Sequence, residues 1–173
     1  IILLILFAAL TVLVQKVDVQ PVGPNGSEIG FAGVNMRVHE KLGENETCYK
    51  LTKLIGYAAI ATAPYFALLA LVQLIQKKSL RGVDGDLWAL AAFYVLLGAC
   101  YVAFEKYVVN YRPILVDGVL EASYPSSHTM LTTAMLGMAI VQMRKRVRGK
   151  ALRGLIDVVL GAAIAAMAVG RLM

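Results

Sequence analysis

Three short segments of the sequence carry side chains that can bind and transfer a phosphoryl group. They are residues 105–113, residues 123–129 and the pair Gly170-Arg171. Their candidate site residues are Lys106, Arg112, Ser126, Ser127, His128 and Arg171. Arginine presents a planar fork that matches phosphate oxygens, serine adds a hydroxyl donor, and histidine changes its charge near neutral pH. These residue types predict phosphoryl transfer, in which charge on the equatorial oxygens must be stabilised.

The middle segment also predicts an anion site built from backbone groups. Pro125 fits the first position of a helix, with Ser123 or Tyr124 before it in the cap region. The three backbone N–H groups that follow the proline would then lie in the first turn, where a helix offers them no acceptor. Together with the helix dipole, such groups attract a phosphate.

Each candidate also has a simpler interpretation. The three basic residues could anchor helix ends at a membrane surface, the two serines could cap a helix, and the histidine could be an ordinary helix residue. The topology derived below places all six on one side of the membrane, which favours a shared site.

The elements that must position these residues are predicted to be membrane-spanning helices. Of the 173 residues, 59% are hydrophobic and 16% are charged, and the mean hydropathy is +0.70. Soluble chains average about 45–50% apolar and about 25% charged residues. This composition excludes a disordered chain, and the presence of only two cysteines excludes a disulfide scaffold.

Five apolar runs predict an all-α, polytopic bundle that forms one membrane-embedded domain over residues 1–173. The runs are 1–14, 54–76, 87–104, 122–143 and 154–170. A cleaved signal peptide is the alternative for the first run, but a basic n-region and a cleavage site are not visible. Because the chain begins at Ile1 and stops at Met173, both within apolar runs, we expect it to be part of a longer protein.

Basic residues set the expected orientation. Loops 77–86 and 144–153 hold nine Lys and Arg in 20 residues, whereas 16–53 and 105–125 hold seven in 59. The two basic loops should therefore face the cytoplasm, and 16–53 becomes a long outer loop with a short helix over 34–42. The same asymmetry accounts for most of the net charge of +6, so membrane lipids rather than nucleic acid are the expected partners.

The motifs resemble those of the type 2 phosphatidic acid phosphatase superfamily of membrane lipid phosphate phosphatases. Tyr111-Arg112-Pro113 and Pro125-Ser126-Ser127-His128 are similar to its first two motifs, and Gly170-Arg171 is similar to the start of the third. Three positions depart from its pattern. Five residues rather than six separate Lys106 from Arg112, Ser127 stands where glycine is usual, and Gly170 stands where serine is usual.

The resemblance implies a role for each candidate residue. Lys106, Arg112 and Arg171 would hold the phosphate oxygens, together with Ser126 and the Ser127 backbone. His128 would be the general acid that protonates the leaving oxygen. A second histidine, oriented by an aspartate of the third motif, would form a phosphohistidine. Both would lie beyond Met173. The resemblance also implies six spans, of which this chain would contain five, and a reaction without metal or cofactor.

The predicted function is hydrolysis of a phosphate monoester or diphosphate of a lipid at the outer face of a bacterial cell membrane. Undecaprenyl diphosphate, phosphatidylglycerol phosphate and phosphatidate are candidate substrates. The alternative is a catalytically inactive relative that binds or transports phosphorylated lipids. The absence of the third-motif histidine and aspartate from residues 1–173 and the irregular spacing of Lys106 support that alternative. A third interpretation is an unrelated polytopic protein with a chance motif match.

Overall fold

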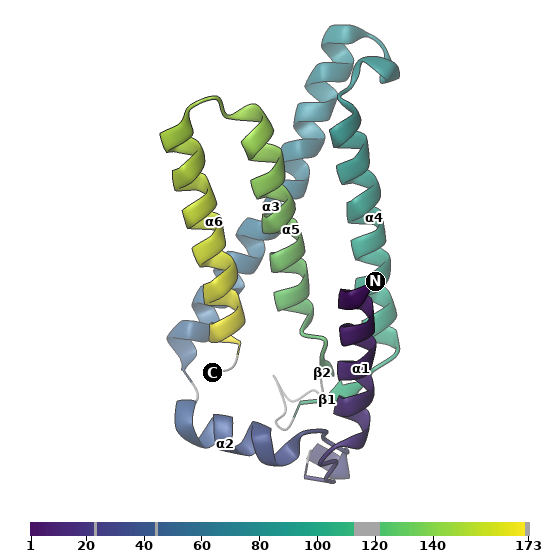
Figure 1. Ribbon diagram of the computed structural model, residues 1–173, viewed down its shortest axis with the longest axis vertical. Coiled ribbons are helices and arrows are strands. Elements are labelled where there is room, and N and C mark those ends of the chain that lie inside the picture. The colour runs from purple at the N-terminus through teal and green to yellow at the C-terminus, as the bar shows by residue number, and fades with distance from the viewer. Residues whose placement is uncertain (23, 44, 113–121, 172–173) are drawn as a thin grey trace. The chain divides into compact units, whose positions relative to one another are not determined.

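The computed structural model describes residues 1–22, 24–43, 45–112 and 122–171, and most of these residues are helical (Figure 1). The all-α prediction is therefore confirmed. The helices are α1 (Ile2–Lys16), α2 (Ala32–Leu42), α3 (Glu46–Lys77), α4 (Gly85–Lys106), α5 (Ser127–Arg146) and α6 (Lys150–Gly170). Two 3₁₀ turns (Pro24–Gly26 and Leu80–Gly82) and two short strands, β1 (Asn110–Tyr111) and β2 (Ala122–Tyr124), complete the described elements.

Three helices of the described chain, α3, α4 and α6, are long and apolar enough to cross a membrane. They correspond to the second, third and fifth predicted spans and indicate an integral membrane protein. The longest, α3, has 32 residues and begins well before its apolar run. Its start is fixed by Asn45, whose side chain accepts a hydrogen bond from the Cys48 N–H at 3.1 Å. The predicted outer loop 16–53 is thus partly helical, with α2 close to the helix expected over 34–42.

The two remaining predicted spans do not share these properties. With 15 residues, α1 covers about 22 Å, less than the ~30 Å hydrocarbon core. The 20 residues of α5 are less apolar, because its first turn is polar and its last turn contains three basic residues, Arg144, Lys145 and Arg146. The described chain therefore has three helices of spanning character where the sequence predicted five.

The predicted start of α5 is also corrected. Residues 122–124 form β2, and the helix begins at Ser127, so Pro125 precedes the helix and does not occupy its first position. Two effects hold this stretch extended. Tyr124 stands before a proline, which disfavours helical backbone, and β2 pairs with β1. The first turn of α5 accordingly starts with Ser127, His128 and Thr129.

The chain divides into two compact units. Unit 1 contains the described residues of 1–44 and 102–127, and unit 2 contains those of 45–101 and 128–171.

In unit 1, side chains of α1 hold the strand pair. The ring of Phe7 stacks on Tyr124 at 6.1 Å and contacts Phe104 edge-on at 5.9 Å. The hydroxyls of Thr11 and Tyr124 lie 3.2 Å apart, within hydrogen-bonding distance. On β1, the buried Asn110 accepts a hydrogen bond from the Gly30 N–H at 2.9 Å. These contacts fix the strands that lead into the first two motifs.

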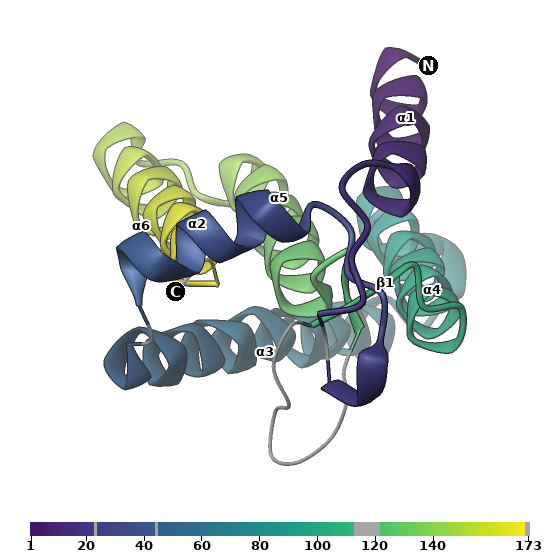
Figure 2. The same ribbon diagram turned by 90° about the horizontal axis from the view of Figure 1, so that it is seen from below.

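Unit 2 is organised around α3. Figures 1 and 2 show α3 running obliquely past α6 and α5, with its start beside the end of α6. Its last turns lie beside the beginning of α4 (Figure 1). Two clusters of buried apolar side chains join these helices. One contains Phe66, Val83, Leu87, Leu90 and Ala139, and the other contains Ala59, Met135 and Leu136.

The two basic loops meet at one end of unit 2. Arg146 Nη1 of α5 donates to Asp86 Oδ2 of α4 at 3.0 Å, and Arg144 Nε donates to Asp157 Oδ2 of α6 at 3.0 Å. Lys145 Nζ lies 3.8 Å from Asp86 Oδ2. These ion pairs tie the start of α4 to α5, and α5 to α6.

Candidate functional site

One face of α3 near its start forms the centre of the candidate site in unit 2. Four residues of this helix lie on a single face, because they occupy positions i, i+3, i+4 and i+7. They are Tyr49, Thr52, Lys53 and Gly56. This face contacts the end of α6 and the first turn of α5.

The backbone of α6 approaches this face very closely at Gly170. A Cβ atom built there would lie 2.6 Å from Thr52 Cγ2 and 3.8 Å from the carbonyl oxygen of Cys48. Thr52 cannot move away easily, because it is only 1% exposed and its hydroxyl donates to the Tyr49 carbonyl at 2.8 Å. Close packing therefore favours glycine where the resembling family has serine.

The next residue, Arg171, lies over the Tyr49 ring. Its Cζ atom is 5.4 Å from the ring centroid, and its N–H donates to the Met167 carbonyl at 3.2 Å. Lys53 Nζ lies 4.6 Å from the same centroid. Both distances are within the range of cation–π attraction, so one ring holds two cations.

His128 reaches the same face one turn further along α3. A Cβ atom on Gly56 would lie 3.9 Å from His128 Cδ2 and 3.8 Å from Met167 Cε, both ordinary contact distances. Met167 is fully buried, which shows that α3 and α6 are well packed at this level. Unit 2 thus brings two of the six candidates, His128 and Arg171, against one helix face together with Lys53.

The other four candidates belong to unit 1. Arg112 directly follows β1, and Ser126 lies between β2 and the start of α5, of which Ser127 is the first residue. The antiparallel pairing of Asn110 with Tyr124 and of Tyr111 with Ala122 connects the two segments.

Lys106 is exposed in the last turn of α4, whereas Arg112, Ser126 and Ser127 are half-buried. Pro113, which completes the first motif, lies outside the described residues. The two sets of candidates are continuous in the chain, because a peptide bond joins Ser127 to His128.

Sequence reasoning missed Tyr49 and Lys53. Both fall within the predicted outer loop 16–53, where Lys53 counts only as one of the basic residues that set the expected orientation. The available signal was the capping pattern at Asn45, which starts the helix before the apolar run and places both residues on it.

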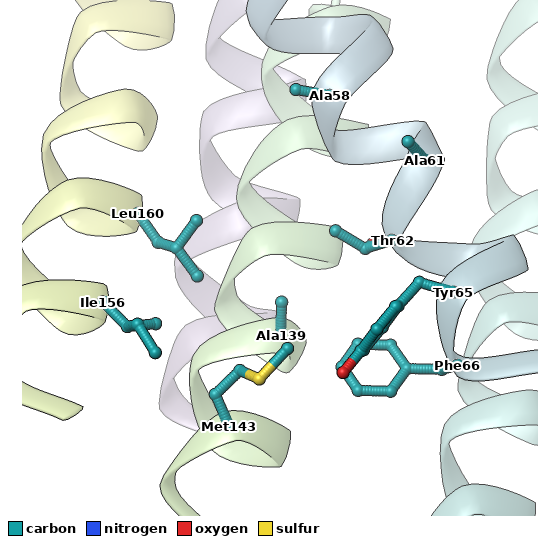
Figure 3. A pocket seen from close by; sticks show the side chains of 9 residues that line it. All are labelled: Ala58, Ala61, Thr62, Tyr65, Phe66, Ala139, Met143, Ile156 and Leu160. Carbon is teal, nitrogen blue, oxygen red and sulfur yellow. The ribbon is translucent and has the colours of Figure 1, made fainter. Parts of the chain in front are cut away.

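A separate apolar pocket of ≈ 290 Å³ lies between α3, α5 and α6. Figure 3 shows the side chains that line it: Ala58, Ala61, Thr62, Tyr65, Phe66, Ala139, Met143, Ile156 and Leu160. None of the six candidate residues is among them. Its lining suits hydrocarbon, so the pocket is distinct from the phosphate-binding candidates.

Comparison of the chain with protein-family models, with curated proteins and with solved structures gives no match. The functional assignment therefore depends on the residues and their geometry.

Proposed function

We propose that the protein is a membrane lipid phosphate phosphatase of the type 2 phosphatidic acid phosphatase superfamily. It hydrolyses a phosphate monoester or diphosphate of a lipid such as phosphatidate, phosphatidylglycerol phosphate or undecaprenyl diphosphate. The observation that carries this proposal is that His128 and Arg171 contact the same face of α3. A proton donor and a phosphate-binding fork thus lie within one small region, beside a second cation.

The proposed membrane layout has five spans, with α1 and α5 crossing alongside α3, α4 and α6. The meeting of the two basic loops at one end of unit 2 supports this layout, because it gives that end the charge of a cytoplasmic face. The His128 end then faces outward, and the setting is a bacterial cell membrane.

Each residue has one task in the proposed reaction. Arg171, Arg112 and Lys106 hold the phosphate oxygens, and Ser126 with the Ser127 backbone binds them as well. Attack by a histidine nitrogen, expected beyond Met173, forms a nitrogen–phosphorus bond and breaks the bond to the leaving oxygen. His128 gives that oxygen its proton. Water then hydrolyses the phosphohistidine and releases inorganic phosphate.

A second function, binding or transport of phosphorylated lipids without hydrolysis, has one specific observation in its favour. Residues 1–173 contain only two histidines, and His39, the one other than His128, lies on α2 in unit 1. A chain without a further histidine would hold phosphate with the same residues and leave it intact.

Phosphate release from phosphatidate in mixed micelles by the complete protein separates the two functions. The His128→Ala variant should lower kcat by about a hundredfold or more, because it removes the proton donor. The matched control is His39→Ala, which should keep full activity. A wild type that binds phosphatidate but releases no phosphate from any of the three lipids is a binding protein. Equal kcat in wild type and His128→Ala refutes the proposed role of His128.

A further inference from the structure

We propose that Lys53 is a phosphate-binding residue that acts with Arg171, and that Tyr49 is the positioning residue for both. This inference rests on the proposed function, because it names a further part of the same site. It assigns α3 a role in substrate binding that none of the three motifs contains.

The charges around Tyr49 provide the first argument. Lys53 Nζ and Arg171 Cζ lie 4.6 and 5.4 Å from one ring centroid, so the two like charges are at most about 10 Å apart. An anion bound near both cations would be attracted by each of them and would offset the repulsion between two like charges. A phosphate monoester fits, since it carries up to two negative charges on three terminal oxygens. The arginine fork and the lysine point charge can bind different oxygens of one group.

The rigidity of the surroundings provides the second argument. Gly170 is packed against Thr52, so the backbone that carries Arg171 is held directly against α3. The Thr52 hydroxyl donates to the Tyr49 carbonyl, which ties Thr52 to the turn that carries the ring. The backbone of Arg171 and the turn that carries Tyr49 are therefore held before any ligand arrives, and this arrangement reduces the entropic cost of binding.

Comparison with Lys50 provides the third argument. Lys50 lies one residue from Tyr49 on the same helix, but its side chain is 71% exposed and pairs with Glu46 at 2.7 Å. Lys53 is half-buried, and its Nζ atom lies over the Tyr49 ring. The chain thus offers a matched control that differs from Lys53 in surroundings and not in residue type.

Equilibrium dialysis of the complete protein in detergent against radiolabelled inorganic phosphate tests the inference. Replacement of Lys53 by Gln should raise the Kd for phosphate by about tenfold or more, as expected for loss of a hydrogen bond to a charged group. Lys53→Arg should restore most of the affinity, and Lys50→Gln should leave it unchanged. Equal Kd values for Lys53→Gln and Lys50→Gln would overturn the inference and identify Lys53 as an interface anchor.

Variants of Tyr49 provide a second measurement that leaves Lys53 in place. Tyr49→Phe keeps the ring and should keep phosphate affinity, whereas Tyr49→Leu should weaken binding severalfold because the cations lose their platform. Similar affinities for both variants would refute the positioning role.

Competition by lipids shows whether the bound phosphate belongs to a lipid or is free inorganic phosphate. Competition by micellar phosphatidate, but not by phosphatidylcholine, would identify a lipid-linked phosphomonoester as the ligand. Phosphatidylcholine competing equally would overturn the phosphomonoester assignment.

Turnover measurements separate the phosphatase function from the role of Lys53. In these measurements Lys53→Gln should raise KM with little change in kcat. If wild type binds phosphate through Lys53 but hydrolyses no lipid, the phosphatase function fails and the binding site stands. If wild type hydrolyses lipid and Lys53→Gln does so with unchanged KM and Kd, the phosphatase function stands and the proposed role of Lys53 fails.

Discussion

Gly170 packs so closely against Thr52 that a Cβ atom at position 170 would lie 2.6 Å from the Thr52 Cγ2 atom. Real Cβ atoms essentially never approach so near, so any side chain at this position forces α3 and α6 apart. Because Arg171 is the next residue, the same contact fixes the position of a cation in the proposed site.

Replacing Gly170 by Ser should therefore reduce both stability and phosphate affinity. Overpacking typically costs about 1–3 kcal/mol in the free energy of unfolding, and displacement of Arg171 should weaken phosphate binding as well. Unfolding followed in mixed detergent micelles measures the first effect, and phosphate dialysis measures the second.

Two further variants make this prediction specific. Gly161→Ser lies on the same helix, where an added Cβ meets open space, and should have little effect. Thr52→Ser removes Cγ2 and keeps the hydroxyl that donates to Tyr49, so it should partly rescue Gly170→Ser. Losses of equal size in Gly161→Ser and Gly170→Ser would show that the contact is unimportant.

Breaking the ion pair between Arg146 and Asp86 should destabilise the opposite end of unit 2. Both side chains are about four-fifths buried, with 19% and 20% exposure, and Arg146 also donates to the Gln142 carbonyl at 3.2 Å. Arg146→Gln leaves a partly buried carboxylate without this donor and should cost about 1–3 kcal/mol in the free energy of unfolding. Phosphate affinity should not change, because the site lies at the other end of α5.

The exposed Arg148 supplies the control for this experiment. Arg148→Gln should leave the free energy of unfolding nearly unchanged. A double-mutant cycle with Asp86→Asn then isolates the coupling, and an interaction energy near zero would contradict the predicted role of the pair.

In unit 1, Asn110→Ala should remove the acceptor for a buried backbone donor. Asn110 accepts from the Gly30 N–H at 2.9 Å and is 8% exposed, so the loss should cost about 1–3 kcal/mol in the free energy of unfolding. Asn35→Ala, at an exposed residue that donates to the Gly30 carbonyl, should cost less. Chemical denaturation of the two variants compares the two hydrogen bonds, and equal losses would refute the importance of burial.

Asp84 should make stability fall at acidic pH. A side-chain hydrogen bond from Gln73 holds the pKa of Asp84 below its ordinary value of 3.8, and Lys77 and Arg146 lower it further. A carboxyl whose pKa is lowered in the folded state stabilises the fold at pH values above its ordinary pKa. This contribution is lost as the pH falls through the folded-state pKa.

Denaturant unfolding of wild type and Asp84→Asn between pH 2.5 and 6, a range chosen to span the ordinary carboxyl titration, tests this assignment. Wild type should lose more stability on acidification than the variant. Identical pH dependence in the two proteins would show that Asp84 does not contribute.

The sequence predicts those elements whose structure is decided by local properties of the chain. The helices α3, α4 and α6 were predicted because each contains a long, nearly uncharged apolar run. The helix α2 was also expected. The stretch 122–124 was predicted as part of a span, because its strand conformation depends on pairing with Asn110 and Tyr111, and no local pattern reports that pairing.

The site was predictable only in residue type. His128 and Arg171 could be predicted as candidates, because the chemistry of histidine and arginine side chains follows from the residue type alone. The proposed roles of Tyr49 and Lys53 depend on where α3 begins and on which helix packs against that face. Which helix packs against the face is a long-range property. It is known only from the structure, in which Arg171 lies over the Tyr49 ring.

The length of α3 gives the membrane itself a means of acting on the site. One continuous helix carries Lys53 at one end and Lys77, which lies 3.7 Å from Asp84, at the other. The uncharged run between them spans about 35 Å, more than the ~30 Å hydrocarbon core, so α3 must lean to fit. A thinner bilayer makes it lean further, and the end of α6 must follow, because Gly170 is packed against Thr52. Bilayer thickness thereby becomes a physical variable that sets the tilt of the proposed phosphate site.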